Sequence, residues 1–333
     1  MDICIACGGH KIIKNDRIEG YIQESFFDIY SCNECGTKWA SPHNVDTVVY
    51  DYIYGNKNDT PGYIRYVQYA EDVTGYCSPL SYLAKQEPAY FGVATSLPKS
   101  GKLLEVGCGL GYFTYALAKS GYDVVGIDVS KGAIDDATKQ YGNYFKNKDF
   151  FSLSVPENEK FDAILMIELI EHVDNPIKYL AHAKTLLKKG GLLIVTTPNR
   201  SWYPDNILWA SDLPPVHLTW FSEKGMTSLS ASLGYSISFT PYTKFNLLHG
   251  SILGPVLNPE LNPSFFKKDG TPLFSKFHHS RVYYFTRRYG LYKFLKRLSL
   301  ILHKLKELPV ILKNPQRLSI RNSTCMCAVM KLD

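Results

Sequence analysis

The sequence lacks the features that carry a chain across a membrane. No apolar segment of the kind found in secretory signals follows Met1, so we expect a cytoplasmic protein. No uninterrupted apolar run is long enough to span a bilayer. The eight cysteines are therefore expected to stay reduced or to bind metal rather than to form disulfides. Internal repeats and low-complexity segments are also absent, and a hydrophobic content of 45% excludes a disordered chain.

A glycine-rich loop between two short apolar runs is the most informative stretch of the chain. The run 103–106 predicts a buried strand, and the run 124–127 predicts a second strand that ends on Asp128. The glycines between them are Gly107, Gly109 and Gly111. Glycines let a loop turn tightly and approach a ligand without a Cβ clash. A carboxylate can accept hydrogen bonds from both hydroxyls of a ribose. The pattern therefore predicts a nucleotide site.

Expected strands and helices alternate through the rest of the central region. Further strands are expected at 146–150, 161–167, 192–199, 235–244 and 324–332. Helices are expected at 111–120, 130–141, 176–187 and 222–233. This alternation predicts an α/β fold with a mostly parallel sheet, and ligands of such sheets bind at the carboxyl ends of the strands.

The loop reads E-V-G-C-G-L-G, with a carboxylate ahead of the glycines in place of the G-x-G-x-x-G spacing that seats a pyrophosphate. It resembles the class I S-adenosylmethionine-dependent methyltransferases. The resemblance implies a Rossmann-like, seven-stranded methyltransferase sheet with helices on both faces, and S-adenosyl-L-methionine as the cofactor. It also implies the residues that contact this methyl donor, which are Glu105, Gly107, Gly109, Gly111, Asp128, Asp149, Phe150 and Ile167.

Two C-x-x-C pairs lie near the N-terminus, separated by 24 residues, and each is followed by a glycine. Two such pairs are typical of a four-cysteine tetrahedral zinc site. Four thiolates leave no open coordination position, so the Zn²⁺ ion would be structural. Two disulfides or unligated thiols are the alternatives. We expect a small zinc ribbon whose ligands are Cys4, Cys7, Cys32 and Cys35.

Acidic and histidine residues follow the expected strand 161–167 directly, in E-L-I-E-H. On a helix, Glu168, Glu171 and His172 would share one face, and His217 follows downstream. The motif T-P-N lies between His172 and His217. The whole pattern resembles small-RNA 3′-terminal 2′-O-methyltransferases and ubiquinone-pathway O-methyltransferases. The resemblance implies that these four residues bind a catalytic divalent ion, which would lower the pKa of an acceptor hydroxyl. Metal-free roles remain open, with His172 as a general base or as a residue that lines the pocket. The catalytic candidates are His172, Glu168 and His217.

Basic charge is concentrated in one segment. Residues 244–321 carry fifteen Lys or Arg against three acids, whereas the whole chain has a net charge of +6. Within this segment, residues 289–308 have apolar side chains at helical spacing with basic residues beside them. Such a helix is typical of a protein that binds an anionic membrane surface or another anionic partner. Packing on the domain with a solvated basic face, or binding a diphosphate, are the alternatives.

These features divide the chain into four expected parts. They are a zinc ribbon (1–45), a tyrosine-rich helical lid and linker (46–98), a methyltransferase core (99–243 with 322–333) and a basic, partly helical insertion before the last strand (244–321). Together they look like bacterial methyltransferases that modify sugars in surface-polysaccharide or secondary-metabolite pathways. We therefore expect O-methylation of a sugar hydroxyl in a nucleotide-sugar or a lipid-linked glycan.

Three other functions remain as alternatives: a sugar C-methyltransferase, an RNA ribose methyltransferase and a catalytically silent binding scaffold. The zinc ribbon and the basic insertion favour RNA, because phosphate contacts need Lys and Arg. The D/N-P-P-Y/F motif of base methylation is absent, however, and a nucleic-acid partner is not expected. The basic insertion adds an expected peripheral location at the inner membrane surface.

Overall fold

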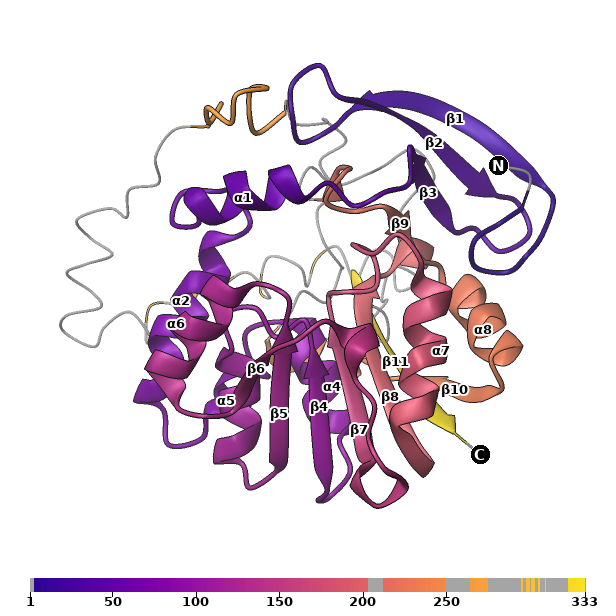
Figure 1. The fold of residues 1–333 in the computed structure, drawn as a ribbon. Coiled ribbons are helices and arrows are strands. Elements are labelled where there is room, and N and C mark those ends of the chain that lie inside the picture. The colour runs from indigo at the N-terminus through magenta and orange to yellow at the C-terminus, as the bar shows by residue number, and fades with distance from the viewer. Residues whose placement is uncertain are drawn as a thin grey trace.

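A mixed seven-stranded sheet forms the centre of the computed structural model (Figure 1). The structure describes residues 3–202, 212–249, 264–274 and 323–332, together with seven helical positions between 295 and 309. In sheet order, the strands are β10 (Tyr235–Phe239), β11 (Cys325–Leu332), β8 (Leu187–Pro198), β7 (Phe161–Ile167), β4 (Lys102–Val106), β5 (Asp123–Asp128) and β6 (Phe145–Asn147). Strand β11 is antiparallel to both of its neighbours, and the other pairs are parallel. This order confirms the expected Rossmann-like methyltransferase fold.

Helices cover both faces of this sheet, as expected. Successive strand residues point to opposite faces, so Leu103 and Leu104 belong to different hydrophobic clusters. One face packs against α4 (Pro88–Ser96), α5 (Tyr112–Lys119) and α6 (Lys131–Tyr141), and the other against α7 (Pro176–Leu186) and α8 (Glu223–Ser232). Three of these helices begin where a side chain caps a free backbone amide. The capping residues are Ser130, Asn175 and Ser222.

Several element boundaries differ from the expected ones. Strand β6 ends at Asn147, because the Asp149 side chain accepts the amide of Phe151 and starts the short 3-10 helix η2 (Phe150–Ser152). Strand β8 begins at Leu187, five residues before the expected strand 192–199, and ends at Pro198. Strand β10 ends at Phe239, before α9 (Thr243–Leu248).

The helix expected at 176–187 begins at Pro176 as predicted, but Glu168, Glu171 and His172 do not share a helical face. Residues 168–173 form a turn, and Glu168 has a φ of 49°. The left-handed backbone at Glu168 prevents a helix from starting there, because helical residues have negative φ.

A second, antiparallel sheet contains the cysteine pairs. Its order is β1 (Ile12–Glu19), β2 (Phe26–Cys32), β3 (Lys38–Ser41) and β9 (Thr219–Trp220). The fourth strand, β9, comes from far later in the chain, after β8. Apolar side chains of this sheet pack against α1 (Thr47–Gly55) and against Phe265 and Phe266. The N-terminal sheet, α1 and part of the insertion therefore share one hydrophobic core.

The N-terminal sheet and α1 lie over the end of the large sheet where the parallel strands finish (Figure 1). The chain then continues through α2 (Ile64–Asp72), η1 (Val73–Gly75) and α3 (Pro79–Leu83) into α4. Two further 3-10 helices are η3 (Glu157–Glu159) and η4 (Arg200–Trp202). Among the described helices, none has both the length and the apolar character needed to cross a membrane. Of the expected basic helix 289–308, only scattered positions from 295 onwards fall within the described residues.

Candidate functional site

The glycine loop joins β4 to α5 and lies against the end of β5. Gly107, Gly109 and Gly111 have φ values of 72, 47 and 76°, a region that glycine adopts at little cost. The Gly109 amide donates to Asp128 Oδ2 at 2.9 Å, and the Ser130 amide donates to Oδ1 at 2.8 Å. These bonds hold the carboxylate of Asp128 beside the loop. A Cβ added to Gly109 would meet no atom within 4 Å, so the loop is open at the point where a ligand would approach it.

Glu105, the acid ahead of the loop, is buried between the sheet and α5. Its side chain accepts a hydrogen bond from the hydroxyl of Thr114. Burial raises the pKa of Glu105 to about 8, although the bond from Thr114 opposes this shift. The carboxyl group is therefore largely protonated at neutral pH in the absence of a ligand.

The other expected donor contacts lie at the ends of neighbouring strands. Asp149 begins η2 after β6, and Phe150 is buried, with its ring stacked on Tyr179 at 5.6 Å. Ile167 is the last residue of β7. The fold thus brings the ends of β4, β5, β6 and β7 to one edge of the sheet. That these residues contact the donor remains a prediction.

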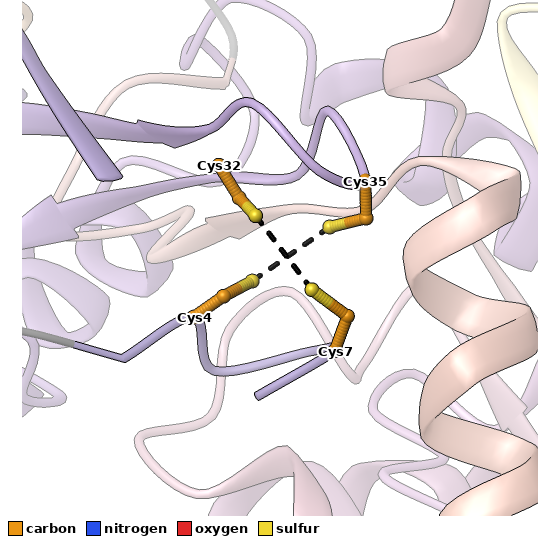
Figure 2. Close-up of side chains that lie close together, drawn as sticks. All are labelled: Cys4, Cys7, Cys32 and Cys35. Atoms are coloured by element: carbon orange, nitrogen blue, oxygen red, sulfur yellow. Dashed lines mark hydrogen bonds between the residues drawn. The ribbon is translucent and has the colours of Figure 1, made fainter. Parts of the chain in front are cut away.

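The four cysteines of the N-terminal ribbon face one another (Figure 2). The Sγ atoms of Cys4 and Cys35 lie 3.7 Å apart, and those of Cys7 and Cys32 lie 3.6 Å apart. A tetrahedron with Zn–S bonds of about 2.3 Å has edges of about 3.8 Å, so the sulfur spacing fits a zinc ion. The hydrogen bond between the two thiols lowers the pKa of Cys35 and raises that of Cys4, so Cys35 is the thiol of this pair that ionises first.

Glu171, His172 and His217 form a second group of possible metal ligands. One donor atom of each lies within 4.8 Å of the others. Both carboxylate oxygens of Glu171 and Nδ1 of His217 are buried without a hydrogen-bond partner among the described residues. Burying such polar atoms unpaired is costly, and a bound cation would compensate for this cost. Carboxylate and imidazole ligands suit magnesium, manganese, iron or zinc. These three residues therefore fit a divalent ion, whereas Glu168 lies outside the group.

The hydrogen bond of His172 determines which of its nitrogens carries the proton. Its Nδ1 lies 2.6 Å from the carbonyl oxygen of Val216. A carbonyl can only accept, so Nδ1 carries the hydrogen and Nε2 has the lone pair. Burial, followed by the neighbouring His217, lowers the pKa of His172 to about 3. Burial, followed by the charge of Arg65, lowers the pKa of His217 to about 3. Both imidazoles are thus neutral at pH 7.

Strand β9 connects the cysteine ribbon to this second group. On one side, β9 pairs with β3, and the Ala40 amide donates to the carbonyl of Leu218 at 2.9 Å. On the other side, the amides of Leu218 and Thr219 donate to the backbone carbonyl of Glu171 at 2.8 and 3.2 Å. The ribbon therefore supports the segment that supplies His217.

Two residues of α2 that were not predicted from the sequence reach the site. The Tyr66 hydroxyl donates to Glu168 Oε2 at 2.8 Å, and Arg65 Nη2 donates to the Tyr66 oxygen at 2.7 Å. The richness of residues 46–98 in tyrosine predicted a lid in this region. Nothing in the spacing of those tyrosines distinguishes Tyr66 from the others.

Known proteins share the central region of this chain. The ubiquinone biosynthesis O-methyltransferase of Cereibacter sphaeroides is 34% identical over 129 residues, which cover 37% of this chain and 52% of that protein. The enzyme of the same name from Ruegeria pomeroyi is 32% identical over 184 residues, which cover 53% of this chain and 71% of that protein. This chain thus spans about half of the first relative and more than two thirds of the second.

Solved structures of methyltransferases are also similar. A possible histamine N-methyltransferase from Thermotoga maritima has 25% sequence identity and a TM-score of 0.39, covering 53% of this chain and 82% of that one. A SAM-dependent methyltransferase from Archaeoglobus fulgidus has 14% identity and a TM-score of 0.44, covering 80% of this chain and 99% of that one.

A family profile described as a methyltransferase domain matches residues 69–238, just over half of the chain. The matched region contains the glycine loop, Asp128 and the turn after β7. The chain therefore belongs to the methyltransferase domain family, within the class I S-adenosylmethionine-dependent methyltransferases.

Proposed function

We propose that this protein transfers a methyl group from S-adenosylmethionine to a hydroxyl oxygen of a small-molecule acceptor. The observation that carries this proposal is the group of Glu171, His172 and His217 beside the glycine loop. Leu169, in the same turn, packs so close to Gly107 that an added Cβ would lie 3.0 Å from its Cδ1 atom. Oxygen as the acceptor atom is supported by relatives named ubiquinone biosynthesis O-methyltransferases.

The donor site is proposed at the ends of β4 to β7. Asp128 would accept hydrogen bonds from the ribose hydroxyls, and the backbone at Gly109 would lie against the donor. Asp149 and Phe150 would contact the adenine, with Glu105, Gly107, Gly111 and Ile167 forming the rest of the site. S-adenosylmethionine would supply a methyl group bound to its sulfonium sulfur, and the bond from carbon to that sulfur would break as the new C–O bond forms.

The base is proposed to be His172 when no metal is bound. Because the Val216 carbonyl fixes the hydrogen on Nδ1, the lone pair on Nε2 is free to accept the proton of the acceptor hydroxyl. Glu168 and His217 would orient that hydroxyl. Holding the two reactants in line for the transfer supplies much of the rate enhancement.

A divalent ion is the second part of the proposal. Glu171, His172 and His217 would hold it, and the ion would supply positive charge that lowers the pKa of the acceptor hydroxyl. With Nε2 of His172 then used as a ligand, Glu168 is the carboxylate that remains to accept the hydroxyl proton.

The acceptor is proposed to carry two neighbouring oxygens, as in a vicinal diol or a catechol, because two oxygens can chelate one ion. A sugar hydroxyl in a nucleotide-sugar or a lipid-linked glycan is the finer proposal. The insertion supports it, since its fifteen basic residues suit a diphosphate. A catechol is the second candidate, supported by the relatives named for ubiquinone biosynthesis.

Labelled donor tests this proposal directly. The purified protein is incubated with panels of nucleotide-sugars, lipid-linked glycans and catechols, and label in each pool is counted. We expect His172→Ala to reduce turnover at least about 100-fold while donor binding persists, and His10→Ala, at an exposed position, to behave as wild type. A wild-type protein that does not bind the donor would overturn the proposal. Full turnover in excess chelator, with the ribbon zinc still bound, would exclude the catalytic metal.

The ribbon is proposed to bind one structural Zn²⁺ through its four cysteines. The spacing of the sulfur atoms supports this, and so does the small size of the module, whose buried apolar residues belong to clusters shared with α1 and with the large sheet. In such modules the free energy of metal binding contributes directly to folding.

Attachment to an anionic membrane surface is proposed for the basic insertion. Five aliphatic side chains at its described helical positions are 41–57% exposed: Leu295, Leu298, Ile301, Leu302 and Leu305. Their spacing of three or four residues places them on one side of a helix. The sequence around them is rich in lysine and arginine, and this combination suits the surface of anionic lipids.

A further inference from the structure

Glu168 is held in an unusual backbone conformation at the end of β7. Its φ of 49° is one of only two positive values among the described residues other than glycine. A glutamate in this left-handed region is strained, so the surrounding structure must hold it there. The Glu168 amide donates to the backbone oxygen of Thr196 at 3.0 Å and lies 3.1 Å from its Oγ1. Strand β8 thus fixes the direction in which the carboxylate leaves the sheet.

A line of hydrogen bonds from α2 ends on that carboxylate. The guanidinium group of Arg65 has only donors, so at 2.7 Å its Nη2 donates and the Tyr66 oxygen accepts. The hydroxyl hydrogen of Tyr66 must then point to Glu168 Oε2, at 2.8 Å. Because this bond ends on one carboxylate oxygen, it holds the Glu168 side chain in one orientation.

Arg65 is itself anchored on the far side. Its Nε lies 3.3 Å from Glu87 Oε1, and the Tyr69 hydroxyl donates to the same oxygen at 2.7 Å. The Arg65 side chain also lies over the Tyr66 ring, with its central carbon 4.6 Å from the ring centre. Edge-to-face contacts with Tyr63 and Tyr69 hold that ring in place. The line from Glu87 to Glu168 is therefore fixed at both ends.

We propose that Tyr66, supported by Arg65, is a positioning residue that aims the Glu168 carboxylate at the acceptor hydroxyl. The inference rests on the proposed methyl transfer to oxygen and deepens it. Tyr66 touches neither the donor nor the acceptor in this proposal, and it acts only through Glu168. It also links α2, in the segment over the sheet, to the segment that carries Glu171 and His172.

A double-mutant cycle of Tyr66→Phe and Glu168→Gln tests this inference. Phenylalanine keeps the ring contacts and removes only the hydroxyl. We expect Tyr66→Phe to lower kcat about 10-fold or more, with the Kd for the donor unchanged. In the Glu168→Gln background the same substitution should change kcat less than 2-fold, because residues that act as one unit are not additive. Tyr82→Phe is the matched control, since that hydroxyl bonds to Asp72 away from Glu168.

The outcomes separate this inference from the proposed function. The wild-type rate with hydroxyl acceptors tests the proposed function, and the ratios between variants test the positioning role. A Tyr66→Phe enzyme with wild-type kcat would overturn the inference. Equal losses in both backgrounds would also overturn it, because they would show that Tyr66 acts independently of Glu168. Thermal unfolding and donor binding of each variant identify losses that arise from misfolding.

Discussion

Gly109 and Gly111 have the same left-handed backbone but very different surroundings. An added Cβ at Gly111 would lie 2.7 Å from both Ala137 Cβ and the Phe145 ring, whereas at Gly109 it would meet nothing. We predict that Gly111→Ala lowers the free energy of unfolding by about 2–4 kcal/mol, through backbone strain and overpacking. Gly109→Ala should cost only about 1 kcal/mol but weaken donor binding. Urea unfolding and donor titration of both variants check this pair, and equal stability of the two would contradict it.

The buried carboxyl of Glu105 predicts a pH dependence of stability. Because its pKa is raised to about 8 in the folded protein, the folded state binds more protons than the unfolded state between about pH 4.5 and 8. The free energy of unfolding therefore falls as pH rises through this range, by up to about 1.4 kcal/mol per pH unit. Glu105→Gln removes the ionisation and keeps the shape. Without donor, we expect the stability of wild type relative to this variant to fall by about 2 kcal/mol between pH 6 and pH 8. If urea unfolding shows that the difference in the free energy of unfolding between wild type and Glu105→Gln does not change with pH, the raised pKa of Glu105 is contradicted.

Residues whose role depends on local spacing were predictable from the sequence, and residues whose role depends on distant contacts were not. The cysteine pairs and the glycine loop are defined within a few positions each, and the structure brings the cysteines together as expected. Tyr66 meets Glu168 across more than a hundred residues, and no local pattern encodes that contact. His217 is an intermediate case. The family resemblance put it in one ligand group with His172, and the centres of the two rings lie 4.6 Å apart in the structure.

At the scale of elements, the cysteine ribbon and the candidate acceptor site depend on each other through β9. We predict that Cys7→Ser, or removal of zinc by a strong chelator, lowers the melting temperature and reduces methyl transfer, because β3 loses its support and β9 then shifts. Cys77→Ser is the matched control, since that thiol is exposed and lies outside the cluster. Metal content, circular dichroism and turnover are measured together. Full activity in a zinc-free protein would show that the ribbon has no role in the site.

The order of the large sheet was predictable because each strand is a short apolar run and its neighbours follow from the family resemblance. The boundaries that failed have local causes. Asp149 caps a 3-10 turn and ends β6 early, and the positive φ of Glu168 puts the residues after β7 in a turn rather than on one helical face. The fourth strand of the ribbon could not be predicted, because β9 has only two residues and gains its structure from partners on both sides. The expected division into four parts remains a prediction.

At the scale of the whole molecule, the exposed aliphatic residues of the insertion predict where the protein resides. We expect it to float with vesicles that contain anionic phosphatidylglycerol, and to float less with neutral phosphatidylcholine vesicles or in high salt. The pair Leu298→Glu and Leu302→Glu should abolish flotation. Leu248→Glu, at an exposed position on α9, should leave it unchanged. Equal flotation of all three proteins would exclude this surface as the membrane contact.

The pairing of β3 with β9 has a consequence for how the protein is made. During synthesis β1, β2 and β3 are made well before the strand that covers the open edge of β3, because β9 follows only after β8. Until then β3 presents unpaired backbone groups, a state that invites association with other chains. The sheet that holds the cysteines is therefore completed only after five strands of the large sheet have been made, and nascent chains that stop before Thr219 carry an edge that β9 covers in the finished protein.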